Sequence, residues 1–237
     1  MDKLTIPKIA LPKASLPSVV MLSEVGTPSF EHCGVGIMLN NKCIVDLNDP
    51  TIKSSYSQDE VIGIALETTN TTTNIDFSLL IPLEAPYSCV WGGWDAKCAT
   101  LAHYGGIMEA ILHENDGEDN TLKCIADQTL THPLRAPMYC HNKIMDGKNC
   151  YLPSIGELCV IMANVTLINA GLRLCGANAL PVDSWFWSSS LADRADDDDL
   201  ESHITYLFGY KYYADGTYFY DGLAVQGGYY ALPIAKL

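Results

Sequence analysis

Tyrosines and aspartates gather near the carboxyl end of the chain, where they have the chemistry of a binding surface. Eight of the thirteen tyrosines lie between Leu191 and Tyr230, together with a group of aspartates. Tyrosine offers a large, rigid contact area, and aspartate accepts hydrogen bonds from the hydroxyl groups of a ligand such as a sugar. The residues nearest an expected hairpin tip form the predicted ligand-binding surface: Tyr212, Tyr213, Asp215, Tyr218, Tyr220 and Asp221.

The pattern of this segment leaves an alternative open. Residues 204–222 alternate and contain Asp215-Gly216, a strong signal for the turn of a β-hairpin. Successive side chains of a strand point to opposite faces of the sheet, so the eight tyrosines do not all face a ligand. In the alternative interpretation, half of them are core residues.

An acidic run, Asp196–Asp199, has Asp193 before it and Glu201 after it. Calcium takes six to eight oxygen ligands from a shaped loop. The spacing is not that of an EF-hand, and neither the EPN nor the QPD triplet of calcium-dependent sugar-binding lectins occurs. We therefore expect a solvated acidic loop and no bound metal.

Two pairs of neighbours, His32-Cys33 and Cys140-His141, have the residue types of a nucleophile and its base. Neighbouring residues on a strand point to opposite faces, so adjacency in sequence is poor support for such a pair. No paired ligand spacing indicates zinc. We expect no enzyme activity and no cofactor.

Composition excludes several classes of protein. The 237 residues are 48% hydrophobic and 18% charged, enough to bury a core, and the formal net charge is −14. Such a surface repels nucleic acid and anionic membranes, so neither is an expected partner. There is no secretory signal, no apolar run of the ~20 residues that span a bilayer, and no C-x-x-C among nine cysteines. We expect reduced, mostly buried cysteines and synthesis in a cytoplasm.

Three pentapeptides of the form Lys-x-x-Ile/Leu-Pro follow the first two residues: KLTIP, KIALP and KASLP. Proline every fifth residue disfavours helix and predicts an extended segment. One interpretation is a floppy tail, and the other is a peptide that docks repeated anchors along a larger particle. The predicted anchoring residues are Lys3, Ile6, Pro7, Lys8, Leu11, Pro12, Lys13, Leu16 and Pro17.

Residues 19–92 have the composition of β-strands. Strands are expected over residues 34–39, 42–47, 61–67 and 77–84. The first two flank Asn40-Asn41, which tolerates the positive φ of a tight turn. A polar loop is expected over 68–74, and a boundary between modules over 88–93.

Residues 95–150 predict short helices and loops. Apolar residues recur at helical spacing over 106–114, and NDGEDN (115–120) predicts a turn. Residues 129–149 include two prolines and predict a loop.

Ser154 and Glu157 form a capping box at the start of a helix. The expected buried stripe of that helix is Ile155, Leu158, Cys159 and Met162. Gly156 costs about 1 kcal/mol relative to alanine inside a helix, so its presence indicates close backbone packing. A second helix is expected over 167–180, ending near Gly176.

Three motifs stand in a recognisable order: LPSIGEL (152–158), WSSS (187–190) and GGYYALPI (227–234). Together they resemble the C-type-lectin-like fold of formylglycine-generating-enzyme-like and Lcl-C-terminal-like domains, as carried on bacteriophage fibres. The resemblance covers residues 149–237 well. VIGIALE (61–67) is similar, less closely, to the small β module that precedes the lectin-like domain in fibre proteins of gut-bacterial phages.

The resemblance implies an α+β fold in three parts: an extended anchor peptide over 1–18, a small β-rich module over 19–92 and a C-type-lectin-like domain over 93–237. It implies a structural role for Trp187 in the core, with Leu152, Leu158 and Ile168 as neighbours. The sequence departs from the pattern at 231–234, where the arginine common in the last strand is absent.

The implied function is that of a phage virion surface fibre, either a head fibre or a decoration protein. Its partners would be capsid or other virion proteins through the N-terminus, and host-surface glycan or protein through the lectin-like domain. A homotrimer is expected, with a dimer as the alternative. The other functions left open are a purely structural virion or tail protein without a ligand, and a tail-tip receptor-binding adhesin. Formylglycine-generating enzymes use cysteines in the same fold, yet we expect none to be catalytic here.

Overall fold

The computed structural model describes residues 33–70, 75–92, 98, 100–104, 107–127, 135–181, 183–192, 206–212, 218–224 and 228–237. The fold is a mixed α+β arrangement of antiparallel sheets and helices, which confirms the predicted class. The anchoring residues Lys3 to Pro17 lie outside the described residues, so their extended geometry stays a prediction.

The first sheet has five antiparallel strands in the order β13-β4-β3-β1-β2. Their bounds are β1 Val35–Leu39, β2 Ile44–Asp46, β3 Val61–Asn70, β4 Ile75–Pro82 and β13 Ala235–Lys236. One face contributes Ile37, Ile64 and Ile81 to the main core, and all three are fully buried. The four predicted strands and the β1–β2 hairpin are confirmed.

Two details of this sheet differ from the prediction. The residue with positive φ after β1 is Lys42, at 68°, and neither Asn40 nor Asn41 has a positive φ. The expected polar loop over 68–74 was too long, because β3 and β4 stay paired as far as Asn70 opposite Ile75. Threonine is β-branched and fits a strand, which explains why β3 continues through Thr68 and Thr69.

The second sheet has six strands, in the order β11-β10-β9-β12-β5 with β6 also paired to β9. Their bounds are β5 Tyr87–Cys89, β6 His103–Tyr104, β9 Ser184–Ala192, β10 Tyr206–Tyr212, β11 Tyr218–Ala224 and β12 Tyr229–Ala231. β9 is central: β10 pairs with it in antiparallel fashion, and β12 and β6 pair with it in parallel at different heights.

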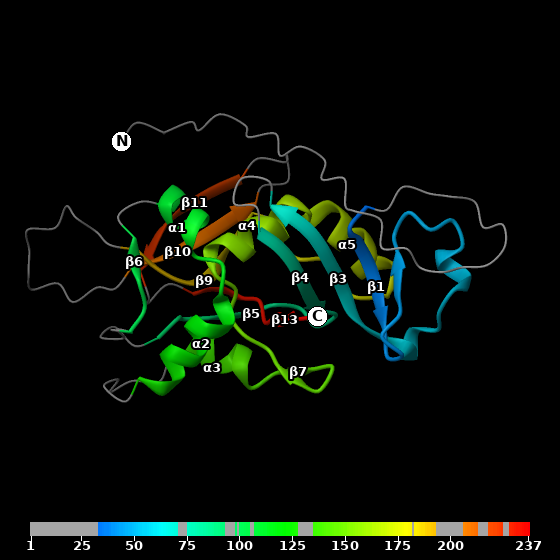
Figure 1. Ribbon diagram of the computed structural model, residues 1–237, viewed down its shortest axis with the longest axis horizontal. Helices are drawn as coiled ribbons and strands as arrows, with labels where there is room; N and C mark the ends of the chain where they lie inside the picture. Colours follow the sequence, from blue (N-terminus) through cyan, green and yellow to red (C-terminus); the bar gives the residue numbers. More distant parts are fainter. Residues whose placement is uncertain are drawn as a thin grey trace, which may run out of the picture.

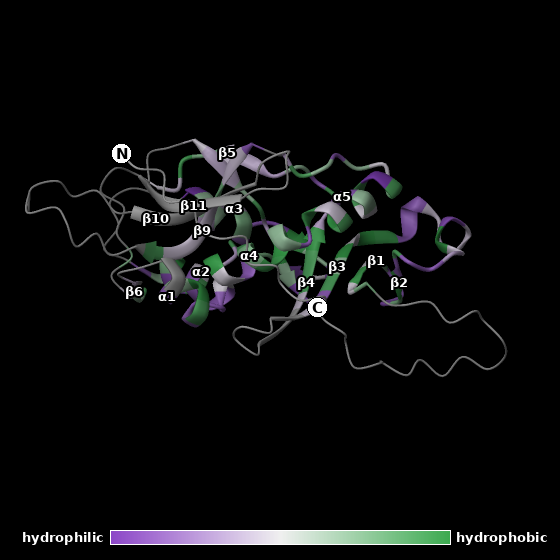
Figure 2. Ribbon diagram, turned by 90° about the horizontal axis from the view of Figure 1, so that it is seen from above, coloured by the Kyte–Doolittle hydropathy of each residue, from purple (hydrophilic) through white to green (hydrophobic). Residues whose placement is uncertain are grey.

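The helices are α1 Ile107–His113, α2 Gly117–Ala126, α3 Arg135–His141, α4 Ile155–Ala163 and α5 Val165–Leu174, with short 3-10 turns at Ile52–Ser54 and Gln58–Glu60. Figure 1 shows α4 between β9 and β10 on one side and β3 and β4 on the other. Residues of α4 therefore join both sheets in one core, together with Phe186 of β9 and Ile64 of β3. The strongest hydrophobic colouring in Figure 2 lies on β1, β3, β4 and α4, whereas β9 is mostly pale.

Two predicted irregular segments are helical. The turn expected over 115–120 is instead the start of α2, because Asp116 is an N-cap whose side chain accepts a hydrogen bond from the Asp119 backbone N–H. The loop expected over 129–149 contains α3 and a β7–β8 hairpin (Ile144–Met145 and Lys148–Asn149). Pro137 is tolerated because it lies in the first turn of α3, where backbone N–H groups need no helical partner.

The C-terminal residues return to the first sheet. Ala235 of β13 pairs with Leu80 of β4, and Ile234 forms a bridge with Tyr151. The β-rich module expected over 19–92 thus shares its sheet with the end of the chain. The proposed boundary between the two modules stays a prediction.

Candidate binding surface

The β10–β11 ribbon carries most of the predicted ligand residues. Its strands are antiparallel from Tyr206 opposite Ala224 to Tyr212 opposite Tyr218, which confirms the predicted hairpin. β11 forms one edge of the second sheet. The turn at 213–217, with Tyr213 and Asp215, lies outside the described residues.

The register of the ribbon separates tyrosines from aspartate. Tyr210 is opposite Tyr220, and Tyr212 is opposite Tyr218, so these four residues occupy one face of the ribbon. Asp221 is opposite Gly209 and therefore occupies the other face. By register, Tyr212, Tyr218 and Tyr220 therefore share one face of the ribbon and Asp221 falls on the other. That the six residues bind a ligand stays a prediction.

β9 supports the ribbon with two fully buried aromatic residues on opposite faces. Phe186 is the register partner of Tyr210 and packs in the main core, 5.7 Å from the Tyr230 ring between centroids. Trp187 is the partner of Gly209, lies 4.8 Å from the Tyr229 ring, and donates its Nε1–H to the Cys89 carbonyl oxygen at 2.8 Å.

The core role predicted for Trp187 is confirmed by this burial. Leu152, one of its predicted neighbours, belongs to the same cluster of buried residues. Leu158 and Ile168 belong instead to the main core, which lies on the Phe186 face of β9.

Burial decreases along β9 toward the tip of the ribbon. The strand is buried from Phe186 to Leu191, half-buried at Trp185 and Ser184, and exposed at Asp183 just before it. Ser184 is the register partner of Tyr212. Tyr212, at the tip end of the ribbon, therefore pairs with the less buried end of β9, and Leu207, at the base of the ribbon, pairs with Leu191 at the buried end.

Two of three consecutive buried serines hold β9 against the helices, Ser190 at the start of α4 and Ser189 at α2. Ser188, Ser189 and Ser190 are fully buried. The Ile155 backbone N–H donates to Ser190 Oγ at 2.9 Å, and Asn120 of α2 donates to Ser189 Oγ at 3.3 Å. Buried hydroxyl groups need hydrogen-bond partners. The run of serines in an otherwise apolar strand was therefore a signal for these contacts in the sequence, although the contacts were not predicted.

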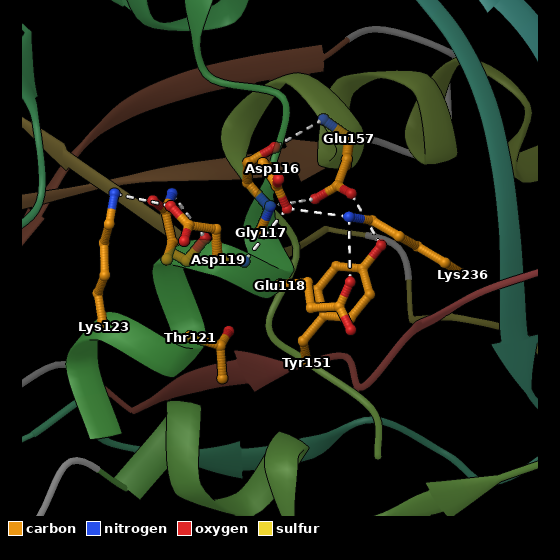
Figure 3. A network of polar contacts seen from close by, with 12 residues as sticks. Asp116, Gly117, Glu118, Asp119, Thr121, Lys123, Tyr151, Glu157 and Lys236 are labelled. Carbon is orange, nitrogen blue, oxygen red and sulfur yellow. Dashed lines mark hydrogen bonds and ion pairs between the residues drawn. The ribbon is translucent and has the colours of Figure 1, made fainter. Parts of the chain in front are cut away.

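Glu157 connects the N-termini of two helices (Figure 3). Its Oε2 accepts hydrogen bonds from the backbone N–H groups of Ser154 at 2.8 Å and Gly117 at 3.0 Å, and its Oε1 accepts one from the Tyr151 hydroxyl at 2.8 Å. Ser154 Oγ accepts from the Glu157 N–H at 3.2 Å, so the predicted capping box is confirmed. Burial raises the pKa of Glu157 to about 7, and the hydrogen bonds it accepts limit that rise.

We call the residues of these contacts, which are Gly117, Tyr151, Ser154, Glu157, Ser189 and Ser190, the helix-start junction. Glycine is required at two positions in or beside this junction, where other atoms lie too close for a side chain. A Cβ on Gly117 would lie 2.5 Å from Glu157 Oε2, and one on Gly156 would lie 2.3 Å from Asn115 Oδ1. The close packing predicted for Gly156 is thus confirmed, whereas Gly117 was not foreseen.

Lys236 fastens the end of the chain to α2. Its Nζ lies 3.0 Å from Asp116 Oδ1 and 3.1 Å from Glu118 Oε2, and 5.9 Å from the centre of the Tyr151 ring. Figure 3 shows this lysine beside the helix-start junction. Lys236 lies 44 residues after Ala192, the last residue of the β9 strand that the same junction supports, so this one region holds both the sheet and the C-terminal residues.

Of the two candidate catalytic pairs, only Cys140-His141 lies wholly within the described residues, and no hydrogen bond joins these two side chains there. Cys33 is half-buried, and its thiol donates to the Val35 carbonyl oxygen at 3.2 Å. Cys140 is fully buried, and desolvation raises the pKa of its thiol well above the usual value. His32 lies outside the described residues.

The described part of the chain contains pockets but no metal-ligand group. No group of three or more His, Cys, Asp or Glu residues able to hold a metal occurs among the described residues, and the acidic run Asp196–Asp199 lies outside them. Two shallow pockets, of about 180 and 230 Å³, flank the β7–β8 hairpin. Neither is lined by β9, β10 or β11.

Within the described ranges, no single helix is long and apolar enough to cross a membrane; α4 and α5 reach that length and composition together, with a bend of 69°. The chain matches no known protein family, no curated protein and no solved structure.

Proposed function

We propose that the protein is a phage virion surface fibre, a head fibre or decoration protein, that presents a C-type-lectin-like domain to the host surface. The β10–β11 ribbon is the adhesive element, and the ligand is a host-surface glycan or protein. The observation that supports this most directly is the decrease of burial along β9 toward the ribbon tip, where Ser184 is half-buried and Asp183 is exposed.

The tyrosine face is proposed as the primary contact of the ribbon, at its tip end. Tyr212 and Tyr218 are directly opposite each other there, level with the half-buried Ser184 of β9. Tyr210 and Tyr220 follow on the same face, level with Phe186, which packs in the main core, so only the tip end of this face lies beside an unburied part of β9. Aromatic rings in such cross-strand pairs offer a flat, rigid platform on which a sugar ring stacks, with hydroxyl groups at its edge. Asp221 lies on the opposite face and is a secondary contact at most.

β9 favours binding because it holds the ribbon in one conformation, so the ribbon loses little conformational entropy when a ligand binds. β9 is held by the buried rings of Phe186 and Trp187 and by side-chain hydrogen bonds of Ser189 and Ser190. A ribbon mounted on such a strand is pre-organised, and pre-organisation is what improves the affinity of a paratope.

The remaining parts of the proposal rest on the sequence. The Lys-x-x-Ile/Leu-Pro repeats, from Lys3 to Pro17, attach the fibre to capsid or other virion proteins. Assembly as a homotrimer gives three ribbons per fibre, and multivalent contacts raise the avidity of weak sites. The protein reaches the virion from the host cytoplasm.

The test is binding of the full-length protein to host cells and to a glycan array. Tyr212→Ala and Tyr218→Ala are each expected to weaken binding about tenfold or more, since each removes a stacking surface. Tyr87→Ala is the matched control, because Tyr87 is an exposed tyrosine on β5, away from the ribbon. Equal binding by all three variants, or no binding by the wild type, contradicts an adhesive ribbon.

Imaging of particles with and without the protein separates the alternatives. Density on the capsid with no host binding favours the purely structural role. Density at the tail tip with host binding favours the tail-tip adhesin.

A further inference from the structure

A small groove lies beside β7, between the β7–β8 hairpin and the end of β4. Its volume is about 180 Å³. Met145, Cys150 and Pro233 line it and are buried, and the half-buried Leu83 and the exposed Ile144 line it nearer to solvent. This groove, which we call the β7 groove, therefore has the size and the apolar lining to accept an aliphatic side chain.

Ile144 presents both a side chain and an open backbone edge at the β7 groove. Its side chain is 71% exposed, more than any other large hydrophobic side chain in the part of the chain that the structure describes. The Cys150 N–H donates to the Lys143 carbonyl oxygen at 2.8 Å, and the next pair of the hairpin is Ile144 opposite Asn149. Bonded and non-bonded pairs alternate along antiparallel strands, so the Ile144 N–H and C=O point away from β8. An extended peptide can bind such an edge through its backbone while a side chain enters the groove.

The Lys-x-x-Ile/Leu-Pro repeats match the β7 groove in their chemistry. Each repeat has an aliphatic residue before a proline, which favours extended backbone, and a lysine three positions earlier. Glu84 lines the groove and is 65% exposed beside Lys143, so its carboxylate is open to a second cation. The first 17 residues carry three lysines and one aspartate, whereas the whole chain has a net charge of −14. The repeats are therefore attracted to the acidic remainder of the chain.

The third repeat, KASLP (13–17), is the nearest of the three to the described residues. Leu16 precedes Cys33 by 17 positions, which in extended form span up to about 55 Å. β1 has five residues, about 17 Å, and leads from Cys33 to Met38, whose register partner is the neighbour of Ile62 in the groove lining. The connecting segment is therefore long enough, and a short connection gives a high effective concentration of the repeat at the groove.

We propose that the third repeat docks in the β7 groove of its own chain. Leu16 enters the groove beside Ile144, and the backbone of the repeat bonds to the open edge of β7. Lys13 pairs with Glu84 at the groove mouth. Docking withholds this repeat from other proteins until they displace it, and it is independent of the adhesive role of the ribbon.

Tryptic cleavage after Lys13 in the native full-length protein measures docking, because cleavage follows the population of the undocked form. Ile144→Ser leaves the cleaved sequence unchanged and removes apolar contact with Leu16, so cleavage is expected to be about fivefold faster than in the wild type. Leu122→Ser is the matched control, since Leu122 is an exposed leucine of α2 that does not line the β7 groove. Equal cleavage rates in all three proteins overturn the proposal.

Hydrogen exchange of the Ile144 N–H provides the reciprocal measurement on an unaltered groove. The triple variant Ile6→Ser, Leu11→Ser, Leu16→Ser removes every aliphatic anchor of the repeats and is expected to speed this exchange about fivefold. The control variant Thr5→Ser, Ala10→Ser changes positions that the repeat pattern leaves free and is expected to exchange as the wild type does. Exchange at one rate in all of these proteins contradicts docking. Protection that increases with protein concentration would show docking onto a second copy and would overturn the contact within one chain.

Discussion

The two sheets of this protein are held in place by different forces. The five-stranded sheet packs aliphatic side chains such as Ile37, Ile64 and Leu66 against helices. The six-stranded sheet carries three buried serines on its central strand and is fixed through the helix-start junction by side-chain hydrogen bonds. Apolar packing is non-directional, whereas hydrogen bonds need one geometry. The sheet that bears the ribbon is therefore the more precisely oriented of the two.

The largest expected effect comes from removing the acceptor at the centre of the junction. Glu157→Ala leaves the Gly117 and Ser154 N–H groups and the Tyr151 hydroxyl buried without their acceptor. Unpaired buried donors cost about 1–3 kcal/mol each, so we expect a loss of about 4 kcal/mol in the free energy of unfolding. Urea denaturation measures it.

Glu157→Gln is the matched control for this change. Its amide oxygen still accepts from the two backbone N–H groups, and its amide N–H donates to the Tyr151 oxygen, so we expect a cost of about 1 kcal/mol. Equal losses in the alanine and glutamine variants would show that volume, and not hydrogen bonding, holds the junction.

The second expected effect is a pH dependence of stability that comes from the junction. Burial raises the pKa of Glu157 from 4.5 to about 7, so the folded state holds this proton more tightly than the unfolded state. The contribution of Glu157 to stability is therefore complete below pH 4.5 and is lost as the pH rises to about 7, a change of about 3 kcal/mol. Glu157→Gln should flatten this slope in urea denaturation measured across that range.

Leu66→Ala in the first sheet provides the comparison. Leu66 is fully buried and carries no titrating group, so its truncation should cost about 3 kcal/mol at every pH. If Glu157→Gln leaves the slope of the free energy of unfolding against pH unchanged, groups other than Glu157 cause the pH dependence.

Much of the first sheet could be predicted from sequence because its signals are local. The aliphatic residues of 61–67 and 77–84 predicted β3 and β4, and the capping box at Ser154 predicted the start of α4. The contact of Gly117 with Glu157 could not be foreseen, since 40 residues separate them and only the fold brings them together. The local sequence Asp116-Gly117 favours a turn. In the structure a helix starts there, and the Gly117 N–H donates a hydrogen bond to Glu157.

The β7–β8 hairpin shows a signal that was present in the sequence. Asp146 and Gly147 both have positive φ, at 54° and 74°, which is the geometry an Asp-Gly turn favours. The prolines at 133 and 137 led to a loop prediction across the whole segment. For the ribbon, strand alternation alone separates Asp221 from Tyr218 and Tyr220. Only the register in the structure places Tyr212 on the same face as these two tyrosines.

The third prediction concerns backbone approach at the junction. Gly156→Ala places a Cβ 2.3 Å from Asn115 Oδ1 and 2.7 Å from the Glu114 carbonyl oxygen, and a carbonyl oxygen of the backbone cannot rotate away. We expect a loss of about 2 kcal/mol. Gly228→Ala is the control, because no atom lies within 4 Å of its Cβ position, and it should change stability by less than about 0.5 kcal/mol. Similar losses at both glycines would mean that the close approach at Gly156 is not the cause.

The smallest expected effect lies where the junction meets solvent. Lys236→Gln removes the ion pairs with Asp116 and Glu118, whose side chains are 56% and 44% exposed. Solvent screens such pairs, so the cost should be about 0.5 kcal/mol and should shrink further in high salt. Leu237, beside it, still bonds through its backbone N–H to the Ser78 carbonyl oxygen, so β13 stays paired. The free energy of unfolding could instead fall as much as in Glu157→Ala, with no decrease of the effect in high salt. That result would mean that Lys236 stabilises the second sheet as strongly as the buried hydrogen bonds of Glu157 do, and the difference between the interior of the junction and its solvent-exposed edge would disappear.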